Sequence, residues 1–354
     1  MREIPSVKNL VIPMVLVASL FVLQLQRSTE QTPRWRYQGM IMGTTFDVQA
    51  YHPVEIKSEV ITEALEAVNE RMSTYIDSSE LSKLNASTTP KALEVSSLLR
   101  RVLTAAKKVT AASGGAFDVT VGPLVNAWGF GPEGRLPTPT TAQISALKER
   151  CGDHLWTLNE AGLTKSRPDV ALDLSAIAKG FAVDEVGRAL EAQGVKRYWV
   201  EVGGEVRVKG QKTDDRAWRV GVERPAGEGR TRIMKVISLK DMSIATSGDY
   251  RNRYVDDQGV IRSHTIDPRT GEPVKHLLAS VSVLHPENML ADAWATALNV
   301  LGPEEGLKVA NQHKIAAFFI IRQNADPQKV ELDLPETEYE ALTTKAFDDY
   351  MNNL

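Results

Sequence analysis

Apolar residues recur every three or four positions in two stretches near the start of the chain, and this spacing predicts two amphipathic helices. The first stripe covers residues 56–72, and the second covers residues 98–112, where a Ser-Gly-Gly run ends the pattern. Two further helices are expected over 176–191 and 287–301. Each of these helices needs a sheet or another helix against which its apolar face can be buried.

Short apolar runs between these helices predict strands. They lie at 46–51, 198–202, 205–209, 218–222 and 279–284, and residues 250–255 and 260–266 look like a hairpin. Because hairpins and helical crossovers are mixed, the order of elements favours an α+β fold over a doubly wound parallel sheet. The prediction is a mixed, largely antiparallel sheet flanked by helices.

Residues 171–187 hold the strongest sign of a binding site. The apolar run that ends at Asp173 predicts a strand that breaks directly into a helix, and the first turn of that helix is small and uncharged. A helix N-terminus has free N–H groups and a partial positive charge, which suit a phosphate. Asp173 beside it can accept a donor group of a ligand, and Lys179 follows one turn later. The alternative is a helix that begins this way and binds nothing.

The last long helix presents Asp292 and Thr296 on the face opposite its apolar stripe. Residues four apart on a helix are neighbours, so this carboxylate and this hydroxyl can share one hard cation. Mg²⁺ becomes credible where a phosphate lies next to the pair, because Mg²⁺ takes few protein ligands. An ordinary solvated helix face is the alternative.

A candidate general base lies at the end of the predicted hairpin. His264 occupies this position, and an imidazole titrates near neutral pH. A histidine with a purely structural hydrogen bond is the alternative. The other five histidines show no metal-ligand spacing, which argues against zinc. The glycine- and proline-rich loop at 129–140 is either a lid or a plain connector.

Composition narrows the class of protein. The chain has 354 residues, 42% of them hydrophobic, which is enough for a globular core. Its net charge of −3 provides no basic stripe for nucleic acid, so no nucleic-acid partner is expected. Cys151 is the single cysteine, which excludes an intramolecular disulfide and a lipoprotein. The sequence also lacks the glycine signatures of a P-loop, a dinucleotide fold and a nucleophile elbow.

The N-terminus resembles an export signal. Arg2 and Lys8 precede an apolar run over 10–25, and no small-residue cleavage site follows it. An uncleaved signal anchor is favoured over a cleaved signal, and a buried core helix is the third possibility. The chain is then expected to comprise a signal peptide or anchor at 1–27, a linker at 28–38, one catalytic domain at 39–332 and an acidic, peripheral tail at 333–354.

Eight segments in order resemble the ApbE family of FAD:protein FMN transferases. They are MGTTFDV, STYIDSSELSKLN, GGAFDVTVGPLVNAWGFG, LDLSAIAKGFAVD, VGGEVRVKG, ATSGDYRNRY, HTIDPRTGEP and ADAWATAL, between Met42 and Leu301. The resemblance implies an enzyme that, with Mg²⁺, cleaves FAD at its pyrophosphate and releases AMP. It also implies that FMN is attached through a phosphoester to a threonine or serine of an exported redox protein.

The resemblance also assigns site residues. The FAD contacts of the family fall on Met42, Tyr75, Ala116, Phe117, Asp118, Asp173, Lys179 and Ile266. Its metal ligands fall on the Ala176 carbonyl, Asp292 and Thr296, and His264 is the candidate that takes the proton from the acceptor hydroxyl. Some members carry a second acid where this chain has Ala295, so the resemblance supports the pair of Asp292 and Thr296 but does not fix the full ligand set.

The implied partner is an acceptor protein with a Thr/Ser flavinylation motif, such as a membrane-associated electron-transfer subunit. Export would place the chain at the periplasmic face of the inner membrane, either anchored by its N-terminal segment or released after cleavage. Two alternatives stay open for the same pocket. One is an FAD pyrophosphatase that gives FMN and AMP with water as acceptor, and the other is a non-catalytic periplasmic flavin-binding protein.

Overall fold

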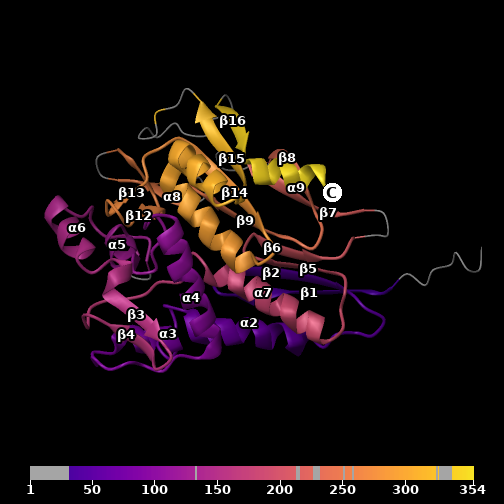
Figure 1. The fold of residues 1–354 in the computed structure, drawn as a ribbon, viewed down its shortest axis with the longest axis horizontal. Coiled ribbons are helices and arrows are strands. Elements are labelled where there is room, and N and C mark those ends of the chain that lie inside the picture. The colour runs from indigo at the N-terminus through magenta and orange to yellow at the C-terminus, as the bar shows by residue number, and fades with distance from the viewer. Residues whose placement is uncertain are drawn as a thin grey trace, which may run out of the picture.

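An eight-stranded sheet forms the centre of the molecule, and every neighbouring pair of its strands is antiparallel. The computed structural model describes residues 32–131, 134–212, 216–225, 232–249, 252–256, 259–323, 326 and 337–354. In sheet order the strands are β1 (Arg34–Ile41), β2 (Thr44–Tyr51), β5 (Tyr198–Val202), β6 (Glu205–Lys209), β9 (Ser243–Gly248), β14 (Leu278–His285), β15 (Ala316–Gln323) and β16 (Glu338–Thr343). The predicted α+β fold with a largely antiparallel sheet and flanking helices is confirmed (Figure 1).

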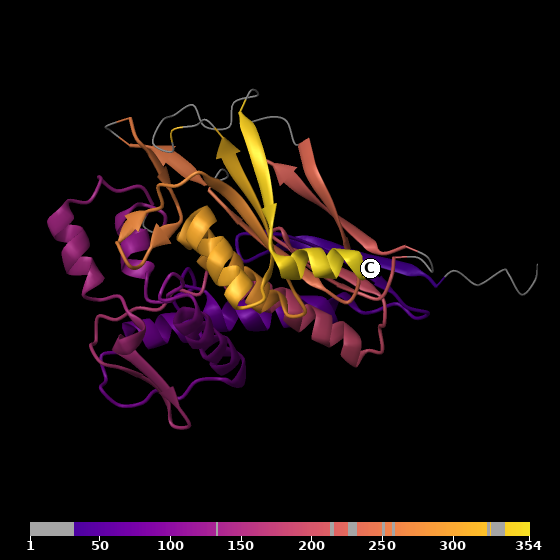
Figure 2. The ribbon, with the colours of Figure 1, turned by 45° about the horizontal axis from the view of Figure 1, so that its top comes forward.

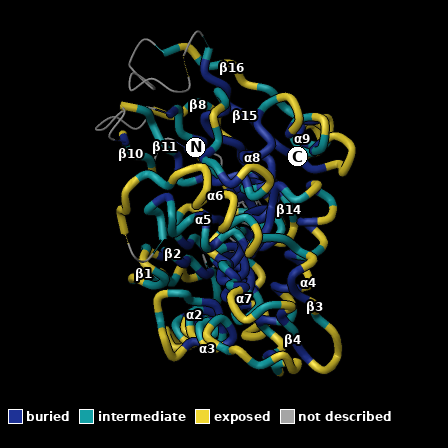
Figure 3. Tube along the Cα trace, turned by 90° about the vertical axis from the view of Figure 1, so that its left-hand side faces the viewer, coloured by how far each residue is buried: buried dark blue, intermediate teal, exposed yellow. Residues whose placement is uncertain are grey.

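Four helices cover one side of the sheet. They are α2 (Ser58–Met72), α4 (Ser97–Ala112), α7 (Ala178–Ala192) and α8 (Asn288–Gln312). Helix α7 packs on β5 and β6, and α8 packs on β9 and β14, while α2 and α4 lie against α7 and α8. The largest hydrophobic core lies between these helices and the sheet. The residues of β14, of β15 and of the first half of α8 are mostly buried, and Figure 3 shows the middle of the molecule in dark blue.

A second, smaller core lies on the opposite face of the sheet. The hairpin of β7 (Trp218–Arg224) and β8 (Arg232–Leu239) covers it together with α9 (Lys345–Asn352). Successive side chains of a strand point to opposite faces of the sheet. In β15, Phe319 therefore lies in the first core and its neighbour Phe318 in the second.

The C-terminal residues form part of the sheet. Strand β16 pairs with β15 along six residues, and α9 buries Phe347 in the second core. Figure 2 shows β16, in yellow, leading into α9. The expectation that 333–354 is a peripheral tail is therefore wrong for 338–352. The apolar pattern of this strand is weak because none of its six residues is fully buried.

Several helices differ in detail from the sequence prediction. Helix α2 begins at Ser58 and buries a stripe formed by Ile61, Leu65, Val68 and Met72. Val68 and Met72 agree with the predicted stripe, whereas Ile61 and Leu65 are buried where the prediction had Val60 and Ala64. Helix α8 continues beyond 301 to Gln312 and bends at Gly302, where φ is 76°. Most of the first half of α8 is buried all round, because the sheet and the helices α7 and α4 surround it.

Shorter elements complete the fold around one end of the sheet (Figure 1). They are α3 (Glu80–Ala86), α5 (Gly122–Ala127), α6 (Thr141–Lys148), the 3-10 turn Asp153–Leu155, β3 (Trp156–Asn159), β4 (Gly162–Lys165), β10 (Arg253–Val255), β11 (Ile261–Ser263), β12 (Ile266–Asp267) and β13 (Glu272–Pro273). Strands β10 and β11 pair as the predicted hairpin. No helix within the described ranges is long and apolar enough to cross a membrane. The predicted signal segment 1–27 lies outside the described residues.

Candidate functional site

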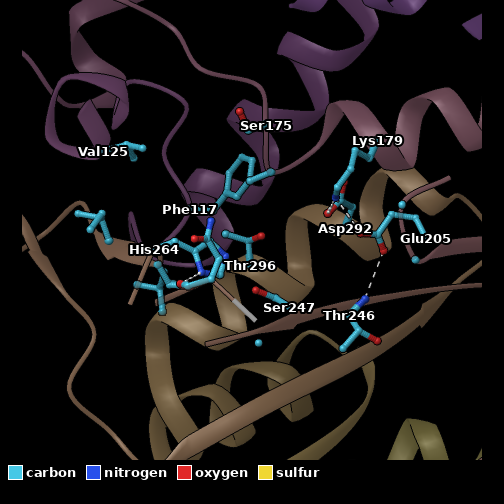
Figure 4. Close-up of a pocket in the computed structure, with 18 of the residues that line it drawn as sticks. Phe117, Val125, Ser175, Lys179, Glu205, Thr246, Ser247, His264, Asp292 and Thr296 are labelled. Atoms are coloured by element: carbon cyan, nitrogen blue, oxygen red, sulfur yellow. Dashed lines mark hydrogen bonds and ion pairs between the residues drawn. The ribbon is translucent and has the colours of Figure 1, made fainter. Parts of the chain in front are cut away.

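A cavity of about 590 Å³ opens where α7 and α8 meet the ends of β6 and β9. Its size lies in the range of small-molecule sites. Residues 116–131, which include α5, and strand β7 complete its walls. Every site residue assigned from the sequence lines this cavity, with the exception of Met42. Figure 4 shows Lys179, Asp292 and Glu205 on one side of it and His264 on the other, with Thr296 and Ser247 between them.

Met42 is the one assigned residue that does not line the cavity. It lies in the turn between β1 and β2 with a φ of 51°, and its side chain packs against the main core. Tyr75 does line the cavity, but it is 70% exposed, so its ring lies at the mouth. The cavity is also lined by the other predicted FAD contacts, which are Ala116 to Asp118, Asp173, Lys179 and Ile266.

The segment that leads into α7 is not the strand that the sequence predicted. The side chain of Asn85 bonds to both backbone groups of Leu172, donating to its carbonyl and accepting from its N–H at 2.8 Å each. These bonds replace a strand partner and hold the segment extended at the cavity wall. Asp173 then accepts a hydrogen bond from the Ser175 N–H at 2.8 Å, and α7 begins at Ala178.

Gly180 allows the two central helices to approach closely. A Cβ atom at this position would lie 2.5 Å from the Asn288 carbonyl oxygen and 2.8 Å from the Cβ of Asp292. Because glycine has no Cβ, the Gly180 N–H reaches Asp292 Oδ2 at 3.0 Å. Because α7 begins at Ala178, this N–H belongs to the first turn and has no carbonyl of its own helix to donate to. The bond therefore satisfies the Gly180 N–H and orients Asp292.

Lys179 lies between two carboxylates. Its Nζ is 2.8 Å from Glu205 Oε1 and 3.7 Å from Asp292 Oδ1. Burial disfavours the ammonium of Lys179, but the two carboxylates outweigh this effect and raise the pKa of Lys179. Burial raises the pKa of Glu205 to about 7, and Lys179 limits that rise. Lys179 is therefore a partly buried cation held by two buried acids at the wall of the cavity.

The donor set around Asp292 fits a hard cation. Asp292 is only 5% exposed, so the alternative of a solvated helix face is wrong. Its Oδ1 faces the Nζ of Lys179 at 3.7 Å, and both Ala176 and Thr296 line the same cavity. A carbonyl, a carboxylate and a hydroxyl are the oxygen ligands that Mg²⁺ takes. Ala295 is buried in the core and contributes no ligand side chain.

His264 directly follows β11, as the sequence predicted. Its Nδ1 lies 2.9 Å from the carbonyl oxygen of Asn252, and its own N–H donates to the same oxygen at 3.1 Å. A carbonyl only accepts, so Nδ1 carries the proton of this bond and Nε2 is left with its lone pair. Burial lowers the pKa of His264, which keeps the ring neutral near pH 7.

One carboxylate oxygen of Asp118 accepts two hydrogen bonds from Thr120. Oδ1 accepts from both the N–H and the hydroxyl of Thr120, at 2.8 and 2.6 Å. Burial raises the pKa of Asp118, and these bonds oppose the rise. The fixed orientation of the carboxylate suits it to accept a hydrogen bond from a ligand in the cavity.

Sequence reasoning did not assign Glu205 and Asn252. The sequence predicts Glu205 only as the first residue of the strand at 205–209, and Asn252 only as part of the hairpin strand at 250–255. An acid at the first position of a buried strand is the one sequence signal for Glu205, since such a residue requires a charged partner. Asn252 acts through its backbone carbonyl, which carries no side-chain signal.

The sequence matches the profile of the ApbE family over residues 42–319. A relative from Haemophilus influenzae, named FAD:protein FMN transferase, is 40% identical over 321 residues, which cover 87% of this chain and 92% of the relative. A relative of the same name from Escherichia coli K12 is 37% identical and covers 81% of this chain, with 84% of its own length matched.

A solved structure of a flavin transferase has a similar fold. The flavin transferase ApbE from Vibrio cholerae superposes with a TM-score of 0.79 at 36% identity, covering 90% of this chain and 99% of that protein. The profile match spans well over half of the chain, and the relatives exceed 30% identity over most of their length. The chain therefore belongs to the ApbE family.

Proposed function

We propose that this protein is a Mg²⁺-dependent FAD:protein FMN transferase. The observation that carries the proposal is one cavity that brings the neutral imidazole of His264 together with the oxygen set of Asp292, Thr296 and Ala176. The names of the relatives support the transferase activity and FAD as substrate. Our proposal adds the metal, the hydroxyl acceptor and the release of AMP.

FAD would bind with its pyrophosphate at the start of α7. The ammonium of Lys179 and the first N–H groups of this 15-residue helix would attract the phosphate charge. The side chain of Tyr75 at the mouth would stack on an aromatic ring of FAD, and Phe117 would pack beside it within the cavity. Asp118 and Asp173 would accept hydrogen bonds from donor groups of the ligand.

Asp292, Thr296 and the Ala176 carbonyl would hold Mg²⁺, and pyrophosphate oxygens would complete its coordination. When bound, the metal would supply charge neutralisation for the phosphoryl group that is transferred. Lys179 would keep Glu205 as its partner while Asp292 binds the metal, because its bond to Glu205 is the shorter of the two. The protein thus has one acid for each of the two cations.

His264 would act on the acceptor. Its Nε2 would take the proton from the threonine or serine hydroxyl while that oxygen attacks the phosphorus on the FMN side of the pyrophosphate. The new phosphoester O–P bond forms, and the bond from this phosphorus to the bridging oxygen breaks. That oxygen leaves with AMP. The bond of Nδ1 to Asn252 would stabilise the imidazolium that results.

We further propose that the protein is exported and works at the periplasmic face of the inner membrane, with 1–27 as signal peptide or anchor, 28–38 as linker and the catalytic domain after it. The support is the sequence pattern of basic residues followed by an apolar run. The acceptor would be an exported electron-transfer protein.

The function is tested with the full chain, FAD, Mg²⁺ and a threonine-containing acceptor protein. A covalent fluorescent band on a denaturing gel, together with one AMP per FMN attached, is the expected result. Free FMN and AMP without a fluorescent band would instead identify the enzyme as a pyrophosphatase. FAD binding without either product would identify a non-catalytic flavin-binding protein.

A further inference from the structure

Asn299 lies behind the wall of the cavity and bonds to two of its lining residues. Its Nδ2 is 3.0 Å from the hydroxyl of Ser247 and 3.2 Å from the hydroxyl of Thr265. Asn299 itself is completely buried and does not line the cavity. Both partners are hydroxyls that can donate or accept, so the two contacts hold for either orientation of the amide. One side chain of α8 thus connects β9 to the residue that follows His264.

The backbone of Asn299 is also held in place. In a regular helix its carbonyl would accept from residue 303, which is a proline without an N–H. The Nε2 of His276 fills this gap by donating to the Asn299 carbonyl at 2.7 Å. The bend at Gly302 makes the approach possible, since a Cβ there would lie 2.8 Å from the His276 ring. Asn299 is therefore fixed by both its side chain and its main chain.

The position of Asn299 on α8 relates it to the proposed metal ligands. Asp292, Thr296 and Asn299 are separated by four and three residues, which places them on one side of the helix. Thr265 is bonded by Asn299 and is the chain neighbour of His264, whose other side is held by Asn252. The helix that carries Asp292 and Thr296 is thereby joined to the segment that carries the base.

The partners of Asn299 set it apart from the other buried asparagine of α8, Asn288. Both side chains have a buried Oδ1 without a hydrogen-bond partner among the described residues, which costs free energy. The Nδ2 of Asn288 donates to two backbone carbonyls, whereas the Nδ2 of Asn299 contacts the side-chain hydroxyls of two residues that line the cavity. A polar side chain at position 299 therefore fixes two hydroxyls of the site.

We propose that Asn299 is a positioning residue, which sets the place of His264 and Ser247 relative to Asp292 and Thr296. The role of this arrangement in transfer rests on the proposed function, whereas the arrangement itself is tested without it. Near-attack geometry is demanding, and a displacement of about 1 Å can slow a reaction about 10²-fold.

Asn288 supplies a matched control. It is a second completely buried asparagine on α8, its Nδ2 also donates twice, and its Oδ1 is likewise unpartnered among the described residues. Its two acceptors are the backbone carbonyls of Val206 and Ile244, and it does not line the cavity. Asn288→Leu therefore reports the purely structural effect of removing such a side chain from this helix.

The first experiment measures kcat for FMN transfer, the Kd for FAD and the melting temperature. We expect Asn299→Leu to lower kcat about 10- to 100-fold with a Kd for FAD within about twofold of wild type. Asn288→Leu should lower the melting temperature with kcat nearly unchanged. Thr265→Val should reproduce the kcat loss, Thr265→Ser should retain activity, and the double variant Asn299→Leu with Thr265→Val should lose little more than either single one.

The proposal is wrong if Asn299→Leu and Asn288→Leu reduce kcat equally, or if the losses at Asn299 and Thr265 multiply. If Asn299→Leu does not fold, the Thr265→Val variant decides, and a wild-type kcat in that variant would also show that the proposal is wrong. Crystal structures of wild type and variant without acceptor give a second test that needs no transfer activity. His264 should move by about 1 Å relative to Asp292 in Asn299→Leu or Thr265→Val, and an unmoved ring overturns the proposal even where the proposed function fails.

Discussion

The Nζ of Lys179 lies 2.8 Å from the carboxylate of Glu205, on the side of the cavity that also holds Asp292. Asp292 is the more distant partner at 3.7 Å, so the three groups together carry one positive and two negative charges. A divalent cation beside Asp292 would reverse this excess of negative charge. This excess of negative charge would favour the proposed metal, and the bond to Glu205 would leave Lys179 a partner when Asp292 binds the metal.

Glu205→Gln tests this arrangement. Removing one negative charge near the metal ligands should raise the Mg²⁺ concentration for half-maximal transfer by up to about tenfold, which corresponds to about 1.4 kcal/mol. A Mg²⁺ titration of the transfer rate gives the measurement. Glu201→Gln is the control, because Glu201 accepts from Gly204 in the same turn but does not line the cavity. Equal Mg²⁺ requirements in all three proteins would contradict the electrostatic role.

Asp292→Asn should reduce transfer at fixed Mg²⁺ by about 10²-fold or more, because a neutral amide is a poor ligand for a hard cation. Asparagine is preferred to alanine here, since its side-chain oxygen can still accept from the Gly180 N–H and keep the helices together. Thr296→Val should cost less, and Thr296→Ser should retain most activity. The metal can be removed from the Asp292→Asn variant with a chelator and Mg²⁺ then added back. Transfer at the wild-type rate after this treatment would show that Asp292 is not a metal ligand.

Asp184 anchors the start of α8 from within the core. It accepts from Arg207 at 2.6 Å and from the backbone N–H groups of Asn288 and Met289 at 3.0 and 2.9 Å. Asp184→Ala should lower the free energy of unfolding by about 3–5 kcal/mol, because it leaves two buried N–H groups unpaired and removes the shorter of the two ion pairs of Arg207, whose other partner is Glu191 at 3.4 Å. Denaturant unfolding measures the change.

The neighbouring Glu185 supplies the control for that measurement. It pairs with Arg101 and Arg188, whose side chains are substantially exposed, so Glu185→Gln should cost less than about 1 kcal/mol. A similar loss of stability in the two variants would mean that burial of the Asp184 pair contributes nothing beyond a surface ion pair.

Periodicity along the chain predicted the elements whose pattern is local. The ranges 198–202 and 205–209 coincide with β5 and β6, since their alternation is strong and two glycines separate them. The strand expected before Asp173 failed because its backbone bonds go to the side chain of Asn85, which lies 87 positions earlier. No window around Asp173 contains that information.

The candidate site was predictable where spacing along one helix sufficed. Asp292 and Thr296 are four residues apart and line the same cavity, as the sequence indicated. The burial of Asp292 was not predictable, since it depends on the approach of Gly180 from another helix. Glu205 was missed for the same reason, because its partner Lys179 belongs to a different element. The assigned roles of these residues stay predictions until they are measured.

Export can be tested by a fusion of residues 1–38 or of the full chain to alkaline phosphatase, which folds actively only outside the cytoplasm. Arg2, Lys8 and the apolar run 10–25 lead us to expect an active fusion that sediments with membranes. An active but soluble fusion would mean that the signal is cleaved. An inactive fusion would contradict export.

The pH dependence of transfer tests His264 as the base. A base works in its neutral form, so the rate should fall as the pH drops through the pKa of His264, and burial lowers that pKa from its ordinary value of 6.5. The acid limb of kcat should therefore lie below pH 6.5, with little change between pH 7 and pH 8. His264→Gln should lose about 10²–10⁴-fold in kcat together with this limb, while the Kd for FAD stays nearly constant. Single-turnover transfer measured from pH 5 to pH 8, with FAD binding in parallel, gives both quantities. A variant that keeps the wild-type rate and the same acid limb would show that the imidazole only holds the Asn252 loop, and that another group takes the proton.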